Sequence, residues 1–147
     1  MSNARTVIPA AGTAESTPST TAPAPGPLVL LVEDDDCVAD VIVHLLVRNG
    51  HRVVRASDGA QAAQHFAAHE LEVALVFLDC GLPDIDGVSL CRVFRRLAPK
   101  LPIILTSGWE SGPARAITGE GPTVFLQKPF FPTDVMRAVN AFRAVTA

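Results

Sequence analysis

The sequence has few cysteines, no long hydrophobic run and no cluster of basic residues. Its three cysteines, Cys37, Cys80 and Cys91, form neither a CxxC pair nor the even-numbered framework of small secreted domains, so we expect reduced thiols and a cytoplasmic protein. No apolar stretch approaches the length of a membrane span, and the N-terminus has no apolar signal core, so we expect neither membrane insertion nor export. The formal net charge of -3, with no clustered Lys or Arg, argues against nucleic-acid binding.

The remaining composition predicts one globular domain behind a disordered N-terminal tail. With 147 residues, of which 48% are hydrophobic, the chain can bury one core and fold alone. Residues 1–27 are rich in Ala, Thr, Ser and Pro, and only Arg5 and Glu15 among them are charged. Such a segment buries too little apolar surface to offset its ordering entropy. We therefore expect a tail over 1–27 and a domain over 28–147.

Polar residues directly follow four apolar runs that read as buried strands. Three carboxylates, two hydroxyls and an ammonium stand at these strand ends: Glu33 and Asp34 after 28–32, Asp79 after 73–78, Thr106 and Ser107 after 103–105, and Lys128 after 124–126. The carboxyl ends of parallel strands meet at one edge of a sheet, which is where open α/β folds bind ligands. The pattern predicts a site at that edge.

Helical patterns separate the strands along the whole domain. A helix is expected over about 36–48, ended by Asn49-Gly50, and others after Asp58, after Gly87, within 108–121 and from Pro132. A short strand at 53–54 completes five strands and five helices in strict alternation. This alternation predicts an α/β fold whose parallel sheet is covered on both faces.

The acidic residues at the strand ends indicate a magnesium site. Glu33, Asp34 and Asp79 would repel one another unless a cation lies among them, and Mg²⁺ prefers such oxygen ligands. Asp79, on the central strand, is the natural nucleophile, while Ser107 and Lys128 can each contact an oxygen of a transferred phosphoryl group. The acidic loop at 84–87 lacks the ligands of a calcium loop and is interpreted as a turn and helix cap.

Four ordered motifs resemble the receiver domain of two-component response regulators. They are Val32-Glu33-Asp34-Asp35, Leu78-Asp79-Cys80-Gly81-Leu82-Pro83-Asp84-Ile85-Asp86-Gly87, Ile104-Leu105-Thr106-Ser107-Gly108-Trp109 and Phe125-Leu126-Gln127-Lys128-Pro129-Phe130. The resemblance covers Leu28 to about Ala144. It implies a flavodoxin-like, doubly wound five-stranded parallel sheet of order 2-1-3-4-5 with five flanking helices.

The resemblance also implies a role for each site residue. Asp79 would be the phosphoacceptor, with Mg²⁺ held directly by Asp34 and Asp79, partly through water by Glu33, and by the backbone carbonyl of Gly81. The remaining residues would act on the phosphoryl group or in the switch: Ser107 as switch hydroxyl, Phe125 as switch aromatic in a position where Tyr is also found, and Lys128 as phosphate partner with a cis bond to Pro129. Gly81 and Trp109 would flank the path of attacking water, and we hypothesise that Trp109 slows hydrolysis.

The function implied is a phosphorelay receiver that takes a phosphoryl group from a histidine kinase or phosphotransfer protein. Phosphorylation would remodel the surface of the fourth and fifth strands and the helices after them, for a downstream protein partner. We expect a monomer or weak homodimer that is no enzyme beyond catalysing its own phosphorylation and dephosphorylation. Two alternatives stay open: a Mg²⁺-dependent phosphohydrolase with an aspartyl intermediate, which Gly81 disfavours, and an unphosphorylated binding module.

Overall fold

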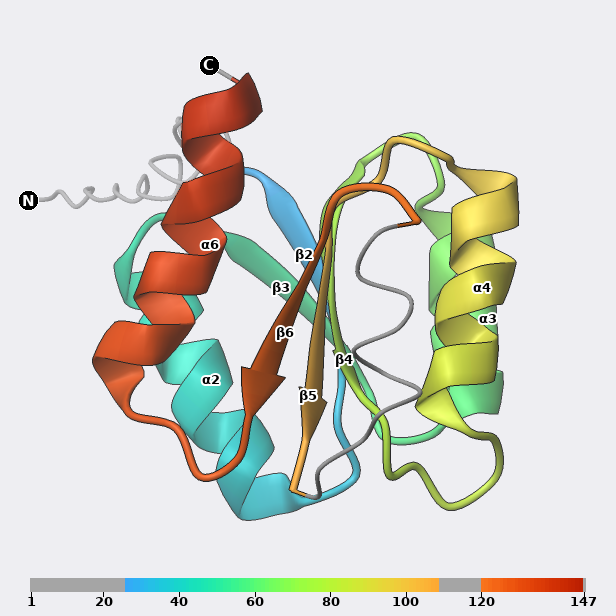
Figure 1. Cartoon of the computed structure of the whole chain (residues 1–147), viewed down its shortest axis with the longest axis horizontal. Coiled ribbons are helices and arrows are strands. Elements are labelled where there is room, and N and C mark those ends of the chain that lie inside the picture. Colours follow the sequence, from blue (N-terminus) through green and yellow to red (C-terminus); the bar gives the residue numbers. More distant parts are fainter. Residues whose placement is uncertain (1–25, 109–119, 147) are drawn as a thin grey trace, which may run out of the picture.

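Strands and helices alternate along the chain in the computed structural model, which describes residues 26–108 and 120–146 (Figure 1). The elements are β2 (Leu28–Val32), α2 (Asp36–Arg48), β3 (Arg52–Ala56), α3 (Gly59–Ala68), β4 (Val73–Asp79), α4 (Gly87–Leu97), β5 (Ile103–Ser107), β6 (Thr123–Gln127) and α6 (Pro132–Thr146). None of the helices in these residues is long and apolar enough to cross a bilayer.

The five strands form one parallel sheet in the order β3-β2-β4-β5-β6. Counted along the chain this is 2-1-3-4-5, so the predicted strand order is confirmed. The central strands β2 and β5 are buried along their whole length, because helices cover both faces of the sheet. The chain reverses its winding direction between β2 and β4, and open α/β folds bind ligands at the carboxyl ends of the two strands where this happens.

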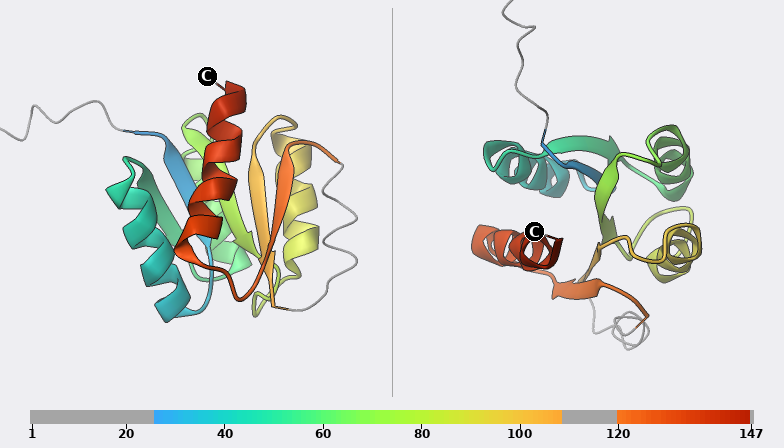
Figure 2. Two further views of the ribbon diagram at one scale, coloured as in Figure 1. Left: turned by 60° about the vertical axis from the view of Figure 1, so that its left-hand side comes forward. Right: turned by 90° about the horizontal axis from the view of Figure 1, so that it is seen from above.

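Two hydrophobic cores lie on opposite faces of the sheet. Alternate residues of β2 point to different faces: Leu30 and Val32 pack towards α3 and α4, whereas Val29 and Leu31 pack towards α2 and α6. Figure 2 shows the same division, with α2 and α6 on one side of the sheet and α3 and α4 on the other. The polar residues thus lie at the carboxyl edge of a sheet that is packed on both faces.

The described residues contain four helices, whereas five were predicted. The expected fourth helix, within 108–121, falls almost entirely outside the described residues, as does the expected tail over 1–27. The other four helices are where the sequence patterns predict them, and α2 has the predicted bounds of 36–48.

Aspartates at the loops fix where the helices begin. The Asp35 carboxylate accepts hydrogen bonds from the backbone N–H groups of Cys37 and Val38 and so caps α2. Asp58 and Asp86 cap α3 and α4 in the same way. Asp84 accepts from the first two N–H groups of α3, at 2.8 and 3.0 Å, and ties the loop after β4 to that helix. The prediction of a turn and cap at 84–87 is confirmed.

Candidate functional site

Three carboxylates meet at the carboxyl ends of β2 and β4. Glu33 and Asp34 directly follow β2, Asp79 is the last residue of β4, and these two strands are neighbours in the sheet. One carboxylate oxygen of each residue lies within 4.8 Å of the others. Glu33 and Asp79 are buried, at 1% and 5% exposure, whereas Asp34 is exposed. The acidic cluster thus has two buried members and one that faces water.

Lys128, just after β6, extends its ammonium into this cluster. Its Nζ lies 3.1 Å from Glu33 Oε1 and 3.3 Å from Asp79 Oδ1. The Lys128 backbone N–H donates to the carbonyl of Ser107 at 2.8 Å, and the Lys128–Pro129 peptide bond is cis, as the resemblance implies. One ammonium therefore bridges two buried carboxylates.

The charges of the cluster shift two pKa values. Burial raises the pKa of Glu33 above its ordinary value of 4.5, and the Asp79 charge raises it further, against the hydrogen bonds from Asp35 and Lys128. Burial by itself would lower the pKa of Lys128, but the carboxylates of Asp79 and Glu33 outweigh it, so the pKa of Lys128 is raised above 10.5. The site holds more negative charge than one ammonium neutralises.

The donor set of the cluster fits a divalent cation. Glu33, Asp34 and Asp79 offer oxygen atoms only, which suits Mg²⁺ and excludes a soft-metal site. The exposure of Asp34 leaves one side of the cluster open to water, and Mg²⁺ keeps several water ligands. The residues present therefore fit the predicted magnesium site.

Two glycines bring the backbone of the loop after β4 close to Asp79. A side chain built at Gly81 would place its Cβ 3.8 Å from Asp79 Oδ2, so the Gly81 backbone borders the carboxylate. A Cβ at Gly87 would lie 2.6 Å from the Asp79 carbonyl oxygen and 2.4 Å from the Cα of Cys80, closer than atoms can approach. Only glycine fits at 87, because the start of α4 packs directly against the end of β4.

The other predicted site residues lie on β5 and β6. Ser107 is the last residue of β5 and is buried, one position beyond Thr106, which is the register partner of Asp79. Phe125 of β6 is half-buried and packs against the core on the α3 and α4 side. Trp109 lies outside the described residues. The acidic cluster, Lys128, Gly81 and Ser107 thus share one edge of the sheet, as predicted.

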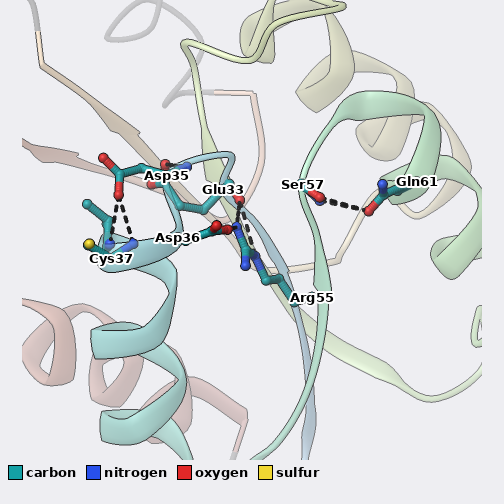
Figure 3. A network of polar contacts seen from close by, with 8 residues as sticks. Glu33, Asp35, Asp36, Cys37, Arg55, Ser57 and Gln61 are labelled. Carbon is teal, nitrogen blue, oxygen red and sulfur yellow. Dashed lines mark hydrogen bonds and ion pairs between the residues drawn. The ribbon is translucent and has the colours of Figure 1, made fainter.

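The sequence interpretation missed Arg55, beside the site, and named Thr106 only as one of the two hydroxyls at a strand end. Arg55, on β3, donates to the backbone carbonyl of Glu33 and forms an ion pair with Asp36 (Figure 3). Thr106 is fully buried, and its hydroxyl has no hydrogen-bond partner among the described residues. A charged residue near the end of the second strand was a signal for Arg55. Nothing in the sequence distinguished Thr106 from the neighbouring Ser107.

The fold and the site together define a class of protein: a doubly wound α/β domain with an acidic cluster and a lysine at the carboxyl edge of its sheet. The comparisons with known proteins identify the family within this class. Residues 29–140 match the sequence model of the family described as response regulator receiver domain. The chain belongs to this family. Its function is that of a receiver domain in two-component phosphorelay signalling, and neither alternative, the phosphohydrolase or the unphosphorylated binding module, is favoured.

Curated relatives include regulators and a kinase. The transcriptional regulatory protein GltR of Pseudomonas aeruginosa is 38% identical over 120 residues, which cover 79% of this chain and 48% of GltR. The sensor kinase CckA of Brucella abortus is 36% identical over 103 residues, covering 69% of this chain and 11% of the kinase. The chain spans about half the length of the first curated relatives it matches.

Solved structures share the fold. A signal receiver domain of an HD domain-containing protein from Pseudomonas fluorescens Pf-5 superimposes with a TM-score of 0.72 at 26% identity, covering 79% of this chain and 93% of that chain. A response regulator receiver domain protein from Clostridium thermocellum gives 0.72 at 22% identity, covering 81% and 98%. Receiver domains are signalling domains rather than conventional enzymes, and phosphorylation and Mg²⁺ binding are general properties of the family.

Proposed function

We propose that Asp79 accepts a phosphoryl group from a histidine kinase or histidine phosphotransfer protein. The observation that carries the proposal is the position of the Lys128 ammonium between Asp79 and Glu33, in a cluster that Asp34 completes. This arrangement supports a nucleophile whose neighbours can neutralise an incoming phosphate. The receiver domain in this proposal extends over 28–147, and residues 1–27 stand outside it.

The proposed transfer exchanges one bond to phosphorus for another. A carboxylate oxygen of Asp79 attacks the phosphorus, and the bond between phosphorus and the donor histidine nitrogen breaks, so that nitrogen keeps the electron pair. Lys128 and the Ser107 hydroxyl each contact an oxygen of the transferred group. Glu33, Asp34, Asp79 and the carbonyl of Gly81 would hold Mg²⁺, which lessens the repulsion between the phosphate and the carboxylates. The domain itself promotes this phosphorylation and its reversal.

The proposed output is a change of surface at β5 and β6. Phosphorylation adds about 1.5 to 2 negative charges at Asp79. Ser107 would move towards the phosphoryl group, and Phe125 would turn into the space it leaves, which remodels the surface formed by β5, β6 and the segments after them. Phe125 has no hydroxyl to bond outward. In this proposal Gly81 and Trp109 flank the path of water, and the bulk of Trp109 slows hydrolysis.

An apolar groove beside Lys128 supports docking of the phosphodonor there. The pocket has a volume of about 570 Å³ and is lined by Cys37, Val38 and Val41 of α2, Gly108, Lys128, Pro129 and Phe130. Lys128, one of the lining residues, also forms the ion pair with Asp79 and so links the groove to the phosphoacceptor. We expect Val41→Asp to slow transfer from a phosphorylated histidine protein and to leave phosphorylation by acetyl phosphate unchanged.

The proposed setting is a cytoplasmic protein that acts through protein contacts. The sequence pI of about 5.7 supports a domain that does not itself bind nucleic acid, whatever accompanies it in a longer protein. We propose a monomer or a weak homodimer, with a downstream protein that reads the β5 and β6 surface.

Incubation with Mg²⁺ and acetyl phosphate, followed by intact mass measurement, tests the phosphoacceptor. We expect one phosphoryl adduct, absent with EDTA and absent in Asp79→Asn. Asp84→Asn is the matched control, because Asp84 lies in the same loop region but caps α3. An adduct retained in Asp79→Asn would overturn the assignment. Multiple turnover of phosphate esters would instead indicate a hydrolase, and no adduct a binding module.

A further inference from the structure

Arg55 forms a clamp on the loop that carries two of the three acidic residues. Its Nε and Nη2 lie 3.3 and 2.9 Å from the carbonyl oxygen of Glu33, and Nη2 also lies 2.8 Å from Asp36 Oδ1. Figure 3 shows the guanidinium between Glu33 and Asp36, reaching from β3 to the start of α2. One side chain on the edge strand thus contacts both ends of the segment 33–36.

Hydrogen bonds or ion pairs fix the side chains of Glu33, Asp35 and Asp36 in this segment, but not that of Asp34. The Glu33 N–H donates to the carbonyl of Ala56, the Asp35 N–H donates to Glu33 Oε2, and the Asp35 carboxylate caps α2. Within residues 26–108 and 120–146, the Asp34 carboxylate forms no hydrogen bond or ion pair. Its direction is therefore set by the backbone that Arg55 clamps.

We infer that Arg55 is a positioning residue for the magnesium ligands Glu33 and Asp34, an inference that rests on the proposed function. A fixed positive charge beside a cation site opposes cation binding by Coulomb repulsion. The ion pair with Asp36 offsets part of that charge, and the two hydrogen bonds to the Glu33 carbonyl orient the peptide that leads into Asp34. Arg55 helps the site through geometry and hinders it through charge.

A surface ion pair without function is the competing interpretation. The Arg55 and Asp36 side chains are 27% and 83% exposed, and ion pairs at the surface contribute little to stability. The two interpretations predict opposite signs for the affinity of Mg²⁺. If Arg55 contributes only its charge, its removal should tighten Mg²⁺ binding. If its hydrogen bonds orient the ligands, its removal should weaken Mg²⁺ binding, because residues that orient metal ligands affect affinity by about 10- to 100-fold.

Titration calorimetry with MgCl₂ on the full chain tests the inference without phosphorylation. In Arg55→Met we expect the Kd for Mg²⁺ to rise on the order of tenfold. Arg55→Lys keeps the charge but replaces the planar guanidinium, which donates from two nitrogens, with a single ammonium, so we expect its Kd to rise as well. Arg52→Met is the matched control, since Arg52 lies on the same strand and pairs with Glu72 at 3.4 Å. Its Kd should equal that of the unmodified protein.

Thermal unfolding in EDTA checks that each variant is folded and registers any general loss of stability. An unchanged or lower Kd in Arg55→Met would overturn the positioning role while leaving the magnesium site intact. A normal Kd in Arg55→Lys would also overturn it, because the planar guanidinium would then not be needed to orient the ligands. If the unmodified protein bound no Mg²⁺, the proposed magnesium site itself would fail, and the inference with it.

Discussion

Replacing Lys128 with Met should destabilise the protein and strengthen its binding of Mg²⁺. The ammonium lies 3.1 Å from Glu33 and 3.3 Å from Asp79, and it is the cation that neutralises these two buried carboxylates. Methionine fills a similar volume but carries no charge. In the variant the two carboxylates face each other uncompensated, so folding must hold them together against their repulsion.

The exposure of the three side chains determines how far the free energy of unfolding should fall in Lys128→Met. The side chains of Glu33 and Asp79 are 2% and 7% exposed, whereas that of Lys128 is 24% exposed. Breaking a fully buried ion pair costs roughly 3–5 kcal/mol, and partial solvation of the lysine reduces this to about 2–3 kcal/mol. At about 3 °C per kcal/mol, the Tm should fall by roughly 6–9 °C.

Unfolding in urea with EDTA at pH 7, repeated with MgCl₂, measures the effect. Saturation with Mg²⁺ at 100 times its Kd adds about 2.7 kcal/mol to the free energy of unfolding. We expect the Lys128→Met protein to bind Mg²⁺ more tightly, because the cation no longer competes with an ammonium. At a fixed concentration of MgCl₂, the difference between variant and unmodified protein should therefore shrink.

Two comparisons make this prediction refutable. Lys100→Met is the matched control, because Lys100 is exposed and forms no ion pair among the described residues, so its free energy of unfolding should change little. In an Asp79→Asn background, Lys128→Met should cost less, since one of the two carboxylates is gone. If Lys128→Met is as stable as the unmodified protein and its Mg²⁺ affinity is unchanged, the ammonium does not act as the bridge.

Three further substitutions test other parts of the fold. Gly87→Ala should lower the free energy of unfolding by about 3 kcal/mol or more and reduce the Asp79 adduct, because its Cβ collides with backbone atoms; normal urea unfolding would contradict this. Thr106→Val should raise the free energy of unfolding by about 1 kcal/mol in the same assay, because the buried hydroxyl has no partner; a loss would mean that it has one. Burial lowers the pKa of His51 below 6.5, so the unfolded chain takes up the proton first and stability should fall as the pH drops below 6.5. His51→Gln should show a shallower decline, and equal slopes would refute this assignment.

Much of the fold could be predicted because its signals are local. The bounds of α2 follow from hydrophobic periodicity between the Asp35 cap and the Asn49-Gly50 stop, where Gly50 has a φ of +89°. The apolar strands and the polar residues at their ends could likewise be predicted directly from the order of residues. By contrast, the predicted strand over 53–54 is longer, Arg52–Ala56, because pairing with β2 extends it at both ends.

The cluster of Glu33, Asp34 and Asp79 was predictable, because parallel strands in an alternating α/β chain must end at one edge. The strand-end pattern also puts Lys128 at the same edge as Asp79, 49 positions earlier, and the family resemblance adds its role as phosphate partner, whereas only the structure gives the distance between them. The contact of Arg55 with the Glu33 carbonyl, which was not predicted, and the burial of the Thr106 hydroxyl both depend on which residues are paired across neighbouring strands.

By itself, the order of residues determined the alternation of strands and helices and the chemical groups at the carboxyl edge, because periodicity, caps and turns act over a few residues. Only the tertiary structure decided that Val32 pairs with Ala56, which brings Arg55 to the Glu33 carbonyl, and that Asp79 pairs with Thr106, which leaves a hydroxyl buried beside the cluster. Strand register depends on how whole faces pack together, so these contacts exist only once the sheet has formed.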